Sequence, residues 1–196
     1  MKTVGNASAE RQIAEFDDRS AAPRGWSNDG EWIFFNRVDP ATMVNVYRMR
    51  ASGAGAPEVV INGPTVEVGA RTSPDDRWLA YLSDETGRLD VFVRSMAPSG
   101  PKLQVSTGGV QFGWWTRDGG ELRFLKRDQT LWRVPIDLRS GAPHLGPAQQ
   151  LGAFPPGILS MDLARDGRFL AVIADRTDGG AVTVVQSWPS ALPPAR

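Results

Sequence analysis

A polar turn followed by a short apolar run recurs four times along the chain. The second copy has the turn SPDDR at residues 73–77 and the apolar run WLAY at residues 78–81. The other three turns centre on Asp29, Asp118 and Asp166, each followed by Gly. Because Asp and Gly tolerate the positive φ angles of tight turns, an Asp-Gly pair between apolar stretches predicts a β-hairpin. We therefore expect four copies of one hairpin unit.

The spacing of the turns indicates the fold class. Their central Asp residues recur at intervals of about 45 residues, and alternating apolar and polar positions around each turn predict four short strands per unit. This period is typical of β-propeller blades. We predict an all-β chain, a single propeller domain over residues 1–196 built from four four-stranded repeats. The repeats are expected at residues 22–61, 67–106, 111–153 and 158–187.

The two ends of the pattern are incomplete in complementary ways. Residues 11–16 have the character of an extra outer strand before the first repeat, whereas the fourth repeat lacks its outermost strand. In a closed ring, residues 11–16 would pair with residues 181–187 of the last repeat and cover a free edge. Alternatively, they belong to a preceding blade outside the chain. The pattern leaves both alternatives open.

The second repeat also carries a family resemblance. The stretch TSPDDRWLAYLSD at residues 72–84, followed by DVFV at residues 90–93, resembles the repeats of TolB-like β-propellers. The stretch VSTGG at residues 105–109 is similar to the C-terminal blades of such modules. This resemblance implies a six-bladed ring, of which four turn motifs would form only a part. We therefore expect a partial, open propeller of the six-bladed type.

The resemblance implies several functions, because related propellers are binding platforms, sensor domains or gating domains of peptidases. We predict a non-catalytic module that acts as a protein-interaction or sensor domain of a larger bacterial signalling protein. The alternatives are a gating propeller of a prolyl-oligopeptidase-like hydrolase and a binder of glycans or small ligands. The compartment would be periplasmic or extracellular if the module is the C-terminal domain of a membrane protein. Residues 1–11 are small and polar, without the apolar stretch of a signal peptide, so we expect none in this chain.

Composition narrows these functions. Lys plus Arg and Asp plus Glu number 22 each, so no net charge attracts nucleic acid or anionic membrane. No apolar run is long enough to span a bilayer. Cys is absent, and the single His, His144, lies in a loop rich in Gly and Pro. We therefore expect no catalytic residue, no metal site and no cofactor.

Positions at which the repeats differ are the best candidates for a site. Most Trp residues fall at repeated strand positions and are expected to pack between blades, namely Trp26, Trp32, Trp78, Trp115 and Trp132. Four residues before each turn Asp, in contrast, stand Gly25, Arg71, Trp114 and Asp162. We predict a rim beside the central channel at which Arg71, Trp114 and Asp162 bind a ligand or a protein partner. The alternative is that each residue only fits its own neighbours.

An open arc has a consequence for assembly. Its two terminal blades would each leave one apolar face without a neighbouring blade, and large exposed apolar surfaces favour association. We therefore expect self-association through these open blades.

Overall fold

The computed structural model describes residues 12–16, 21–139, 143–164 and 168–173. All regular elements in this part of the chain are β-strands in antiparallel sheets, so the all-β prediction is confirmed. Blade 1 consists of β1 (Ala21–Trp26), β2 (Trp32–Asp39), β3 (Met43–Arg50) and β4 (Glu58–Ile61). Blade 2 consists of β5 (Glu67–Thr72), β6 (Trp78–Ser83), β7 (Asp90–Ser95) and β8 (Lys102–Gln104). In both blades the strands pair in sequence order, as expected for propeller blades.

Blade 3 has one strand more than predicted. It consists of β9 (Val110–Trp115), β10 (Glu121–Lys126), β11 (Thr130–Asp137), β12 (His144–Leu145) and β13 (Gln149–Ala153). Strand β13 pairs with the first half of β11, and the short β12 pairs with its far end. The far end of the long β11 is thus free to pair with His144 and Leu145, which were expected to lie in a loop. Blade 4 is described as β14 (Ile158–Leu163) and β15 (Phe169–Ile173). Its expected third strand, residues 181–185, and its turn at Asp166 lie outside the described residues.

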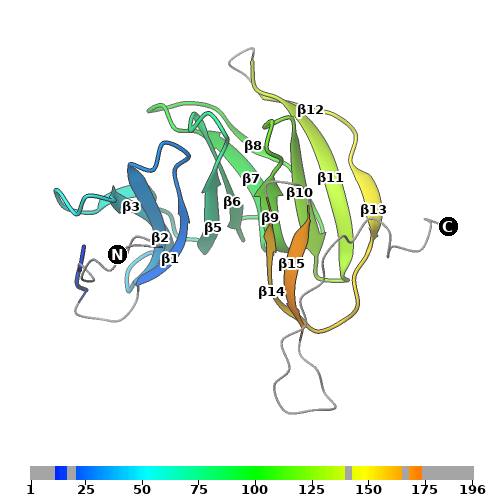
Figure 1. The fold of residues 1–196 in the computed structure, drawn as a ribbon, viewed down its shortest axis with the longest axis horizontal. Helices are drawn as coiled ribbons and strands as arrows, with labels where there is room; N and C mark the ends of the chain where they lie inside the picture. The colour runs from blue at the N-terminus through cyan, green and yellow to red at the C-terminus, as the bar shows by residue number, and fades with distance from the viewer. Residues whose placement is uncertain (1–11, 17–20, 140–142, 165–167, 174–196) are drawn as a thin grey trace, which may run out of the picture.

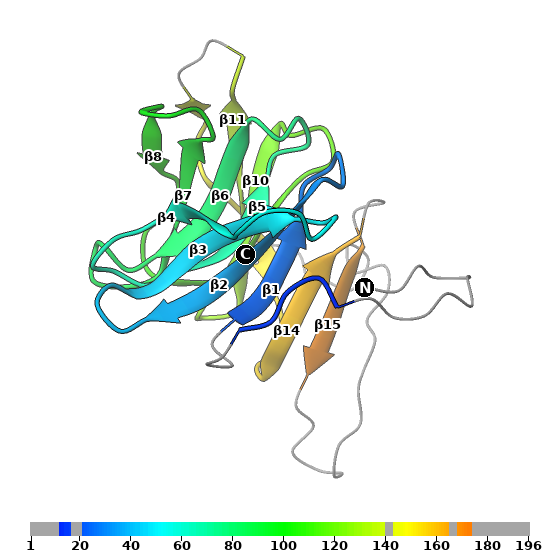
Figure 2. The same cartoon turned by 90° about the vertical axis from the view of Figure 1, so that its left-hand side faces the viewer.

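The blades stand next to one another in an arc (Figure 1). Inner strand β1 lies against β5, β5 against β9, and β9 against β14. Figure 2 views the arc from blade 1, with β14 and β15 drawn beyond the edge of that blade. None of the described residues belongs to a helix long and apolar enough to cross a membrane.

Apolar side chains fill the spaces between successive blades. Phe34 and Leu79 belong to the cluster between blades 1 and 2. Trp78 and Phe124 belong to the cluster between blades 2 and 3 and are 3% and 1% exposed. Phe169 belongs to the cluster between blades 3 and 4. Alternating side chains of each central blade therefore point to opposite neighbours, as the period of two in the sequence requires.

The turn Asp residues have the structural role that their position suggests. In the second turn, the Ser73 hydroxyl donates to Asp75 Oδ1 (2.6 Å), and the Trp78 amide donates to Ser73 Oγ (3.0 Å). Asp29 and Asp118 accept the same bond from Ser27 (2.5 Å) and Thr116 (2.6 Å). Each Asp also accepts an amide hydrogen two residues further along the chain. These carboxylates therefore close their own turns.

The segment before the first repeat corrects one prediction. Residues 12–16 form no strand, although residues 11–16 were expected to be an outer strand. Instead, Ile13, Ala14 and Phe16 pack on the outer face of blade 1, where the Phe16 ring lies 5.3 Å from the Phe35 ring. Ile13 approaches blade 1 so closely that a side chain at Gly53 would meet its carbonyl oxygen at 3.3 Å. Apolar contact with a sheet face, rather than edge pairing, thus holds this segment. Arg11 lies outside the described residues.

Candidate binding site at the inner-strand rim

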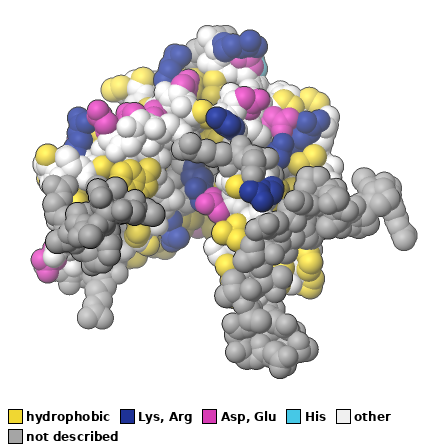
Figure 3. All heavy atoms as spheres, viewed as in Figure 1, with side chains coloured by type: hydrophobic (Ala, Val, Ile, Leu, Met, Phe, Trp, Pro, Cys, Tyr) yellow, Lys and Arg dark blue, Asp and Glu magenta, His cyan; other side chains and the backbone are white. Residues whose placement is uncertain are grey.

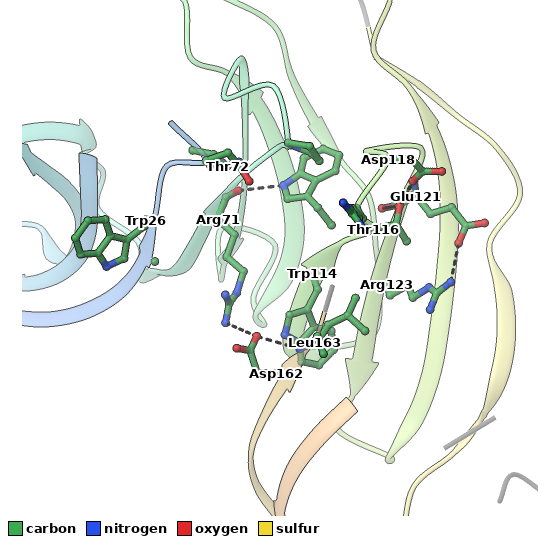
Figure 4. Close-up of a pocket in the computed structure, with 16 residues that line it drawn as sticks. Trp26, Arg71, Thr72, Trp114, Thr116, Asp118, Glu121, Arg123, Asp162 and Leu163 are labelled. Carbon is green, nitrogen blue, oxygen red and sulfur yellow. Dashed lines mark hydrogen bonds and ion pairs between the residues drawn. The ribbon is translucent and has the colours of Figure 1, made fainter. Parts of the chain in front are cut away.

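The four positions at which the repeats differ come together in one cavity. Gly25, Arg71, Trp114 and Asp162 lie on the inner strands of blades 1 to 4, and all four line an open cavity of about 1030 Å³ (Figure 4). The inner strands run side by side and turn at the same end. Because each residue lies four positions before its turn Asp, the four residues lie at similar positions along the axis of the arc. The proposed binding role of these residues stays a prediction.

An ion pair joins two of the predicted residues across the cavity. Arg71 Nη2 of blade 2 lies 3.3 Å from Asp162 Oδ1 of blade 4, and the two side chains are 36% and 61% exposed. Exposed ion pairs of this kind contribute only about 0–1 kcal/mol to stability. The Arg71 carbonyl also accepts a hydrogen bond from Trp115 Nε1 (3.1 Å), which fixes β5 against β9. The backbone at Arg71 is thus firmly held, whereas its side chain makes a weak contact.

Trp114 differs from the prediction, because it is a core residue and not an exposed anchor. Its side chain is only 3% exposed. Its ring lies 5.5 Å from the Phe169 ring and 6.0 Å from the Phe112 ring. The indole therefore fills the space between blades 3 and 4, although Trp114 also belongs to the residues that line the cavity. For this residue the alternative interpretation, accommodation of neighbouring side chains, describes the structure.

For Trp26, the prediction of packing between blades is wrong. It was expected to pack between blades, but it is 49% exposed and lines the cavity (Figure 4). Trp115 occupies the same position of the third repeat and is 9% exposed, because it packs against blade 2. Trp26 belongs to blade 1, and among the described residues no blade packs against this face of blade 1. The position of Trp26 in the first repeat of an open arc could have predicted its exposure.

Two further arginines line the cavity on the side of blade 3. The Arg123 side chain is 27% exposed, and its closest carboxylate contact is the 3.5 Å distance from Nη2 to Glu121 Oε2. Its Nε is buried without a hydrogen-bond acceptor in the described part of the chain. Arg117, in the third turn, is exposed and has no hydrogen-bond or ion-pair partner among the described residues. Neither arginine was singled out from the sequence, because both lie outside the position four residues before the turn Asp.

The two carboxylates on the same side are already engaged. Glu121 Oε1 accepts a hydrogen bond from Arg133 at 2.7 Å. Asp118 accepts from the Thr116 hydroxyl and the Gly120 amide, and these two hydrogen bonds hold the pKa of Asp118 below its ordinary value. Figure 3 shows basic and acidic side chains interspersed over the visible face of the molecule. The cavity thus combines a guanidinium group that is unpaired among the described residues, that of Arg117, and two weakly paired ones with carboxylates that accept shorter hydrogen bonds from other partners.

The described residues contain no group of three or more His, Asp or Glu side chains placed to hold a metal ion. A second, smaller hollow of about 480 Å³ lies between the turns of blades 2 and 3 and is lined by Asp75, Asp118 and Asp137. Asp118 is committed to its turn, and Asp137 pairs with Arg139 at 2.9 Å, whose hydrogen bonds lower the pKa of Asp137 to about 2. The cavity at the inner-strand rim is therefore the stronger candidate site.

The arc of four-stranded sheets places the chain among the β-propellers, and comparison with solved structures supports this fold. The chain is similar to a protein described as TolB from Agrobacterium tumefaciens, with a TM-score of 0.53 and 18% identity over 69% of this chain and 52% of that one. A component of a nidogen/laminin complex matches with a TM-score of 0.56 and 10% identity over 79% of this chain and 58% of that one. No family model matches the sequence, and no curated protein does.

A prolyl endopeptidase also matches, with a TM-score of 0.51 and 18% identity over 87% of this chain and 26% of that one. The TolB-like type of propeller fold expected from the turn motif is thus confirmed at the level of the fold. The chain spans about half the length of the TolB protein and of the nidogen/laminin component. The matched proteins include an enzyme and a component of a protein complex, so this fold occurs in both enzymes and binding proteins.

Proposed function

We propose that this chain is a non-catalytic binding module that holds a segment of a protein partner in the cavity at the inner-strand rim. One observation carries the proposal: all four blades contribute to a single cavity, and they do so at the position where their sequences differ. A position needed only for repeated packing would tend to keep one residue type. Variation among Gly25, Arg71 and Asp162 fits a surface that is shaped for a ligand, whereas Trp114 serves packing between blades 3 and 4.

The lining of the cavity favours a peptide as the ligand. Arg and Trp side chains contribute most of the binding energy in many protein interfaces, and the cavity offers exposed Arg71, Arg117 and Trp26. Its volume of about 1030 Å³ lies at the upper end of the range of small-molecule sites, and it is open to solvent. An extended chain segment would fill it better than a small metabolite. Such a module would act as an interaction or sensor domain of a larger protein.

An unbiased binding screen tests this function. The full chain is applied to an array of randomised peptides and to an array of glycans, together with two charge-reversal variants. Arg71→Glu changes the cavity, whereas Arg77→Glu changes an exposed arginine of the second turn that does not line it. We expect the wild-type chain and Arg77→Glu to bind the same peptides, and Arg71→Glu to lose them while its circular dichroism spectrum stays unchanged.

Three results would contradict the proposal. Retention of the peptides by Arg71→Glu would place binding elsewhere. Binding of glycans alone would favour the alternative of a carbohydrate binder. Bound peptides that mass spectrometry finds shortened after incubation would show catalysis, which a non-catalytic module excludes.

A further inference from the structure

We infer that the rim cavity recognises a carboxylate of the bound peptide, with Arg71 as its main partner and Asp162 as a built-in competitor for the same guanidinium group. This inference rests on the proposed function, because it names the chemistry by which that cavity would select its ligand. It follows from which charged groups of the cavity are occupied and which are free.

The spare hydrogen-bonding capacity of the cavity is on the cationic side. A guanidinium group carries five N–H donors. Arg117 has no partner among the described residues, and Arg123 has a buried Nε without an acceptor there. Arg71 has one side-chain contact, at 3.3 Å, which is longer than the roughly 2.7–2.9 Å of a strong charge-assisted hydrogen bond. The donors of Arg117 and most donors of Arg71 therefore remain available for an anionic ligand, whereas Arg123 has a buried Nε and lies near Glu121.

The acidic side chains of the cavity, in contrast, have little capacity for a cationic ligand. Glu121 is held by Arg133 at 2.7 Å, and Asp118 accepts two hydrogen bonds within its own turn. Asp162 Oδ1 also accepts a hydrogen bond from the Leu163 amide (3.0 Å), in addition to its contact with Arg71. A ligand with a positive charge would thus have to compete with existing partners of every carboxylate in the cavity. A ligand with a negative charge would compete at Arg71 only with Asp162.

Asp162 can be displaced at low cost. It is 61% exposed, so water can solvate its carboxylate when Arg71 turns away from it. A peptide carboxylate could then form two parallel hydrogen bonds with the Arg71 guanidinium, which is stronger and more directional than the present single contact. Figure 4 shows the Arg71 and Asp162 side chains meeting in front of the inner strands, with Trp26 on the blade 1 side. The exposed Trp26 ring would contact the peptide beside its carboxylate.

The two partners of this ion pair should respond in opposite directions to mutation, which gives a sharp test. The probes are three mixtures of randomised pentapeptides labelled with an uncharged fluorophore: neutral with a free C-terminal carboxylate, neutral with a C-terminal amide, and amidated with one Glu. Binding to the full chain is measured by fluorescence anisotropy. Arg71→Gln, Asp162→Asn and the control Arg77→Gln keep the approximate size of each side chain.

We expect one or both carboxylate mixtures to bind the wild-type chain and the neutral amide mixture to bind at least tenfold more weakly. Comparison of the two carboxylate mixtures distinguishes a C-terminus from an acidic side chain. Arg71→Gln should weaken binding by about tenfold or more, since it removes a charge-assisted hydrogen-bond partner. Asp162→Asn should tighten binding about two- to fivefold, because it removes the competitor. Arg77→Gln should leave binding unchanged.

Two results would overturn the inference alone. Equal binding of the neutral amide mixture would show that peptides bind without using a carboxylate, and the proposed function would stand. Weaker binding by Asp162→Asn, with an unchanged circular dichroism spectrum, would make Asp162 a ligand contact and not a competitor. Absence of binding by all three mixtures would overturn the inference and the proposed function together.

Discussion

Asp76 shows how a single side chain connects two blades. It stands where two of the other turns have Gly30 and Gly119, and like them it has a positive φ, 56°. Its carboxylate accepts hydrogen bonds from the Asn28 amide (2.9 Å), the Asn28 side chain (3.0 Å) and the Asp29 amide (3.0 Å). The strained backbone of a non-Gly residue is thus offset by contacts between the first and second turns.

The protonation of Asp76 should affect stability in acid. Burial alone would raise its pKa, but hydrogen bonds from Thr72, Asn28 and Asp29 outweigh burial and hold the pKa below the ordinary value of 3.8. A folded-state pKa below the unfolded one stabilises the fold above the unfolded pKa, and this contribution disappears as the pH falls through the folded pKa. We expect Asp76→Gly, which keeps the turn but loses the carboxylate, to lose less stability than wild type on acidification below about pH 4. Urea denaturation at a series of pH values measures this, and parallel curves would refute it.

Two tryptophans provide a matched pair for separating packing from binding. Trp114 is 3% exposed and Trp26 is 49% exposed. Trp114→Ala should lower the free energy of unfolding by about 3–5 kcal/mol, as for other buried aromatic residues, whereas Trp26→Ala should cost about 1 kcal/mol or less. Chemical denaturation of both variants measures the difference. Similar losses in the two variants would mean that Trp26 is also a packing residue.

Residue patterns predicted part of the site. Equal spacing from the turns identified Arg71 and Asp162, because regular strands convert equal spacing into equal height. The same pattern could not distinguish Trp26 from Trp114, since exposure depends on which neighbouring blade covers each residue. The roles of Arg117 and Arg123 could not be predicted either. They depend on contacts between residues far apart in the sequence, such as that between Glu121 and Arg133, which lie twelve residues apart.

At the scale of elements, strands were predictable where alternation and turn chemistry agreed. The prediction of a strand at residues 11–16 was wrong because the adjacent residues Ile13 and Ala14 both pack on blade 1. In a strand, adjacent side chains point to opposite faces. Strand β12 was not predicted because it consists of only two residues, which pair with the far end of β11. Gly146 follows it at a close approach, where a side chain would meet Pro135 at 3.0 Å.

The contact of residues 12–16 with blade 1 should contribute to stability. Phe16 lies against Phe35, with the Arg37 guanidinium 5.6 Å from its ring. Phe16→Ala should lower the free energy of unfolding by roughly 1–2 kcal/mol, since its half-buried ring loses part of the value of a fully buried one. Glu15→Ala, at an exposed position of the same segment, is the control and should change it by less than about 0.5 kcal/mol. An unchanged melting curve of Phe16→Ala would show that the segment does not stabilise blade 1.

At the scale of the whole molecule, the two ends of the arc differ. Residues 12–16 cover part of the outer face of blade 1. On blade 4, Leu159 and Leu170 project with 66% and 49% of their surfaces exposed. Apolar side chains between successive blades are buried or partly buried in the described chain, so we expect another apolar surface to bind this more exposed face.

The whole chain should therefore associate through blade 4 as its concentration rises. Light scattering over a range of concentrations should show a growing average mass for the wild-type chain. Leu159→Lys should reduce this association, while Val38→Lys, at a 50% exposed position of blade 1, should leave it unchanged. A monodisperse monomer at high concentration of the wild-type chain would contradict the expectation.

Locating a bound peptide on the chain tests directly whether the inner-strand rim is the binding site. A peptide selected in the binding screen is given a photoreactive group, crosslinked to the wild-type chain and mapped by mass spectrometry. We expect crosslinks to cavity-lining segments of several blades, around Trp26, Arg71, Arg117 and Asp162. Crosslinks concentrated on the outer face of blade 4, at Leu159 and Leu170, would contradict this expectation.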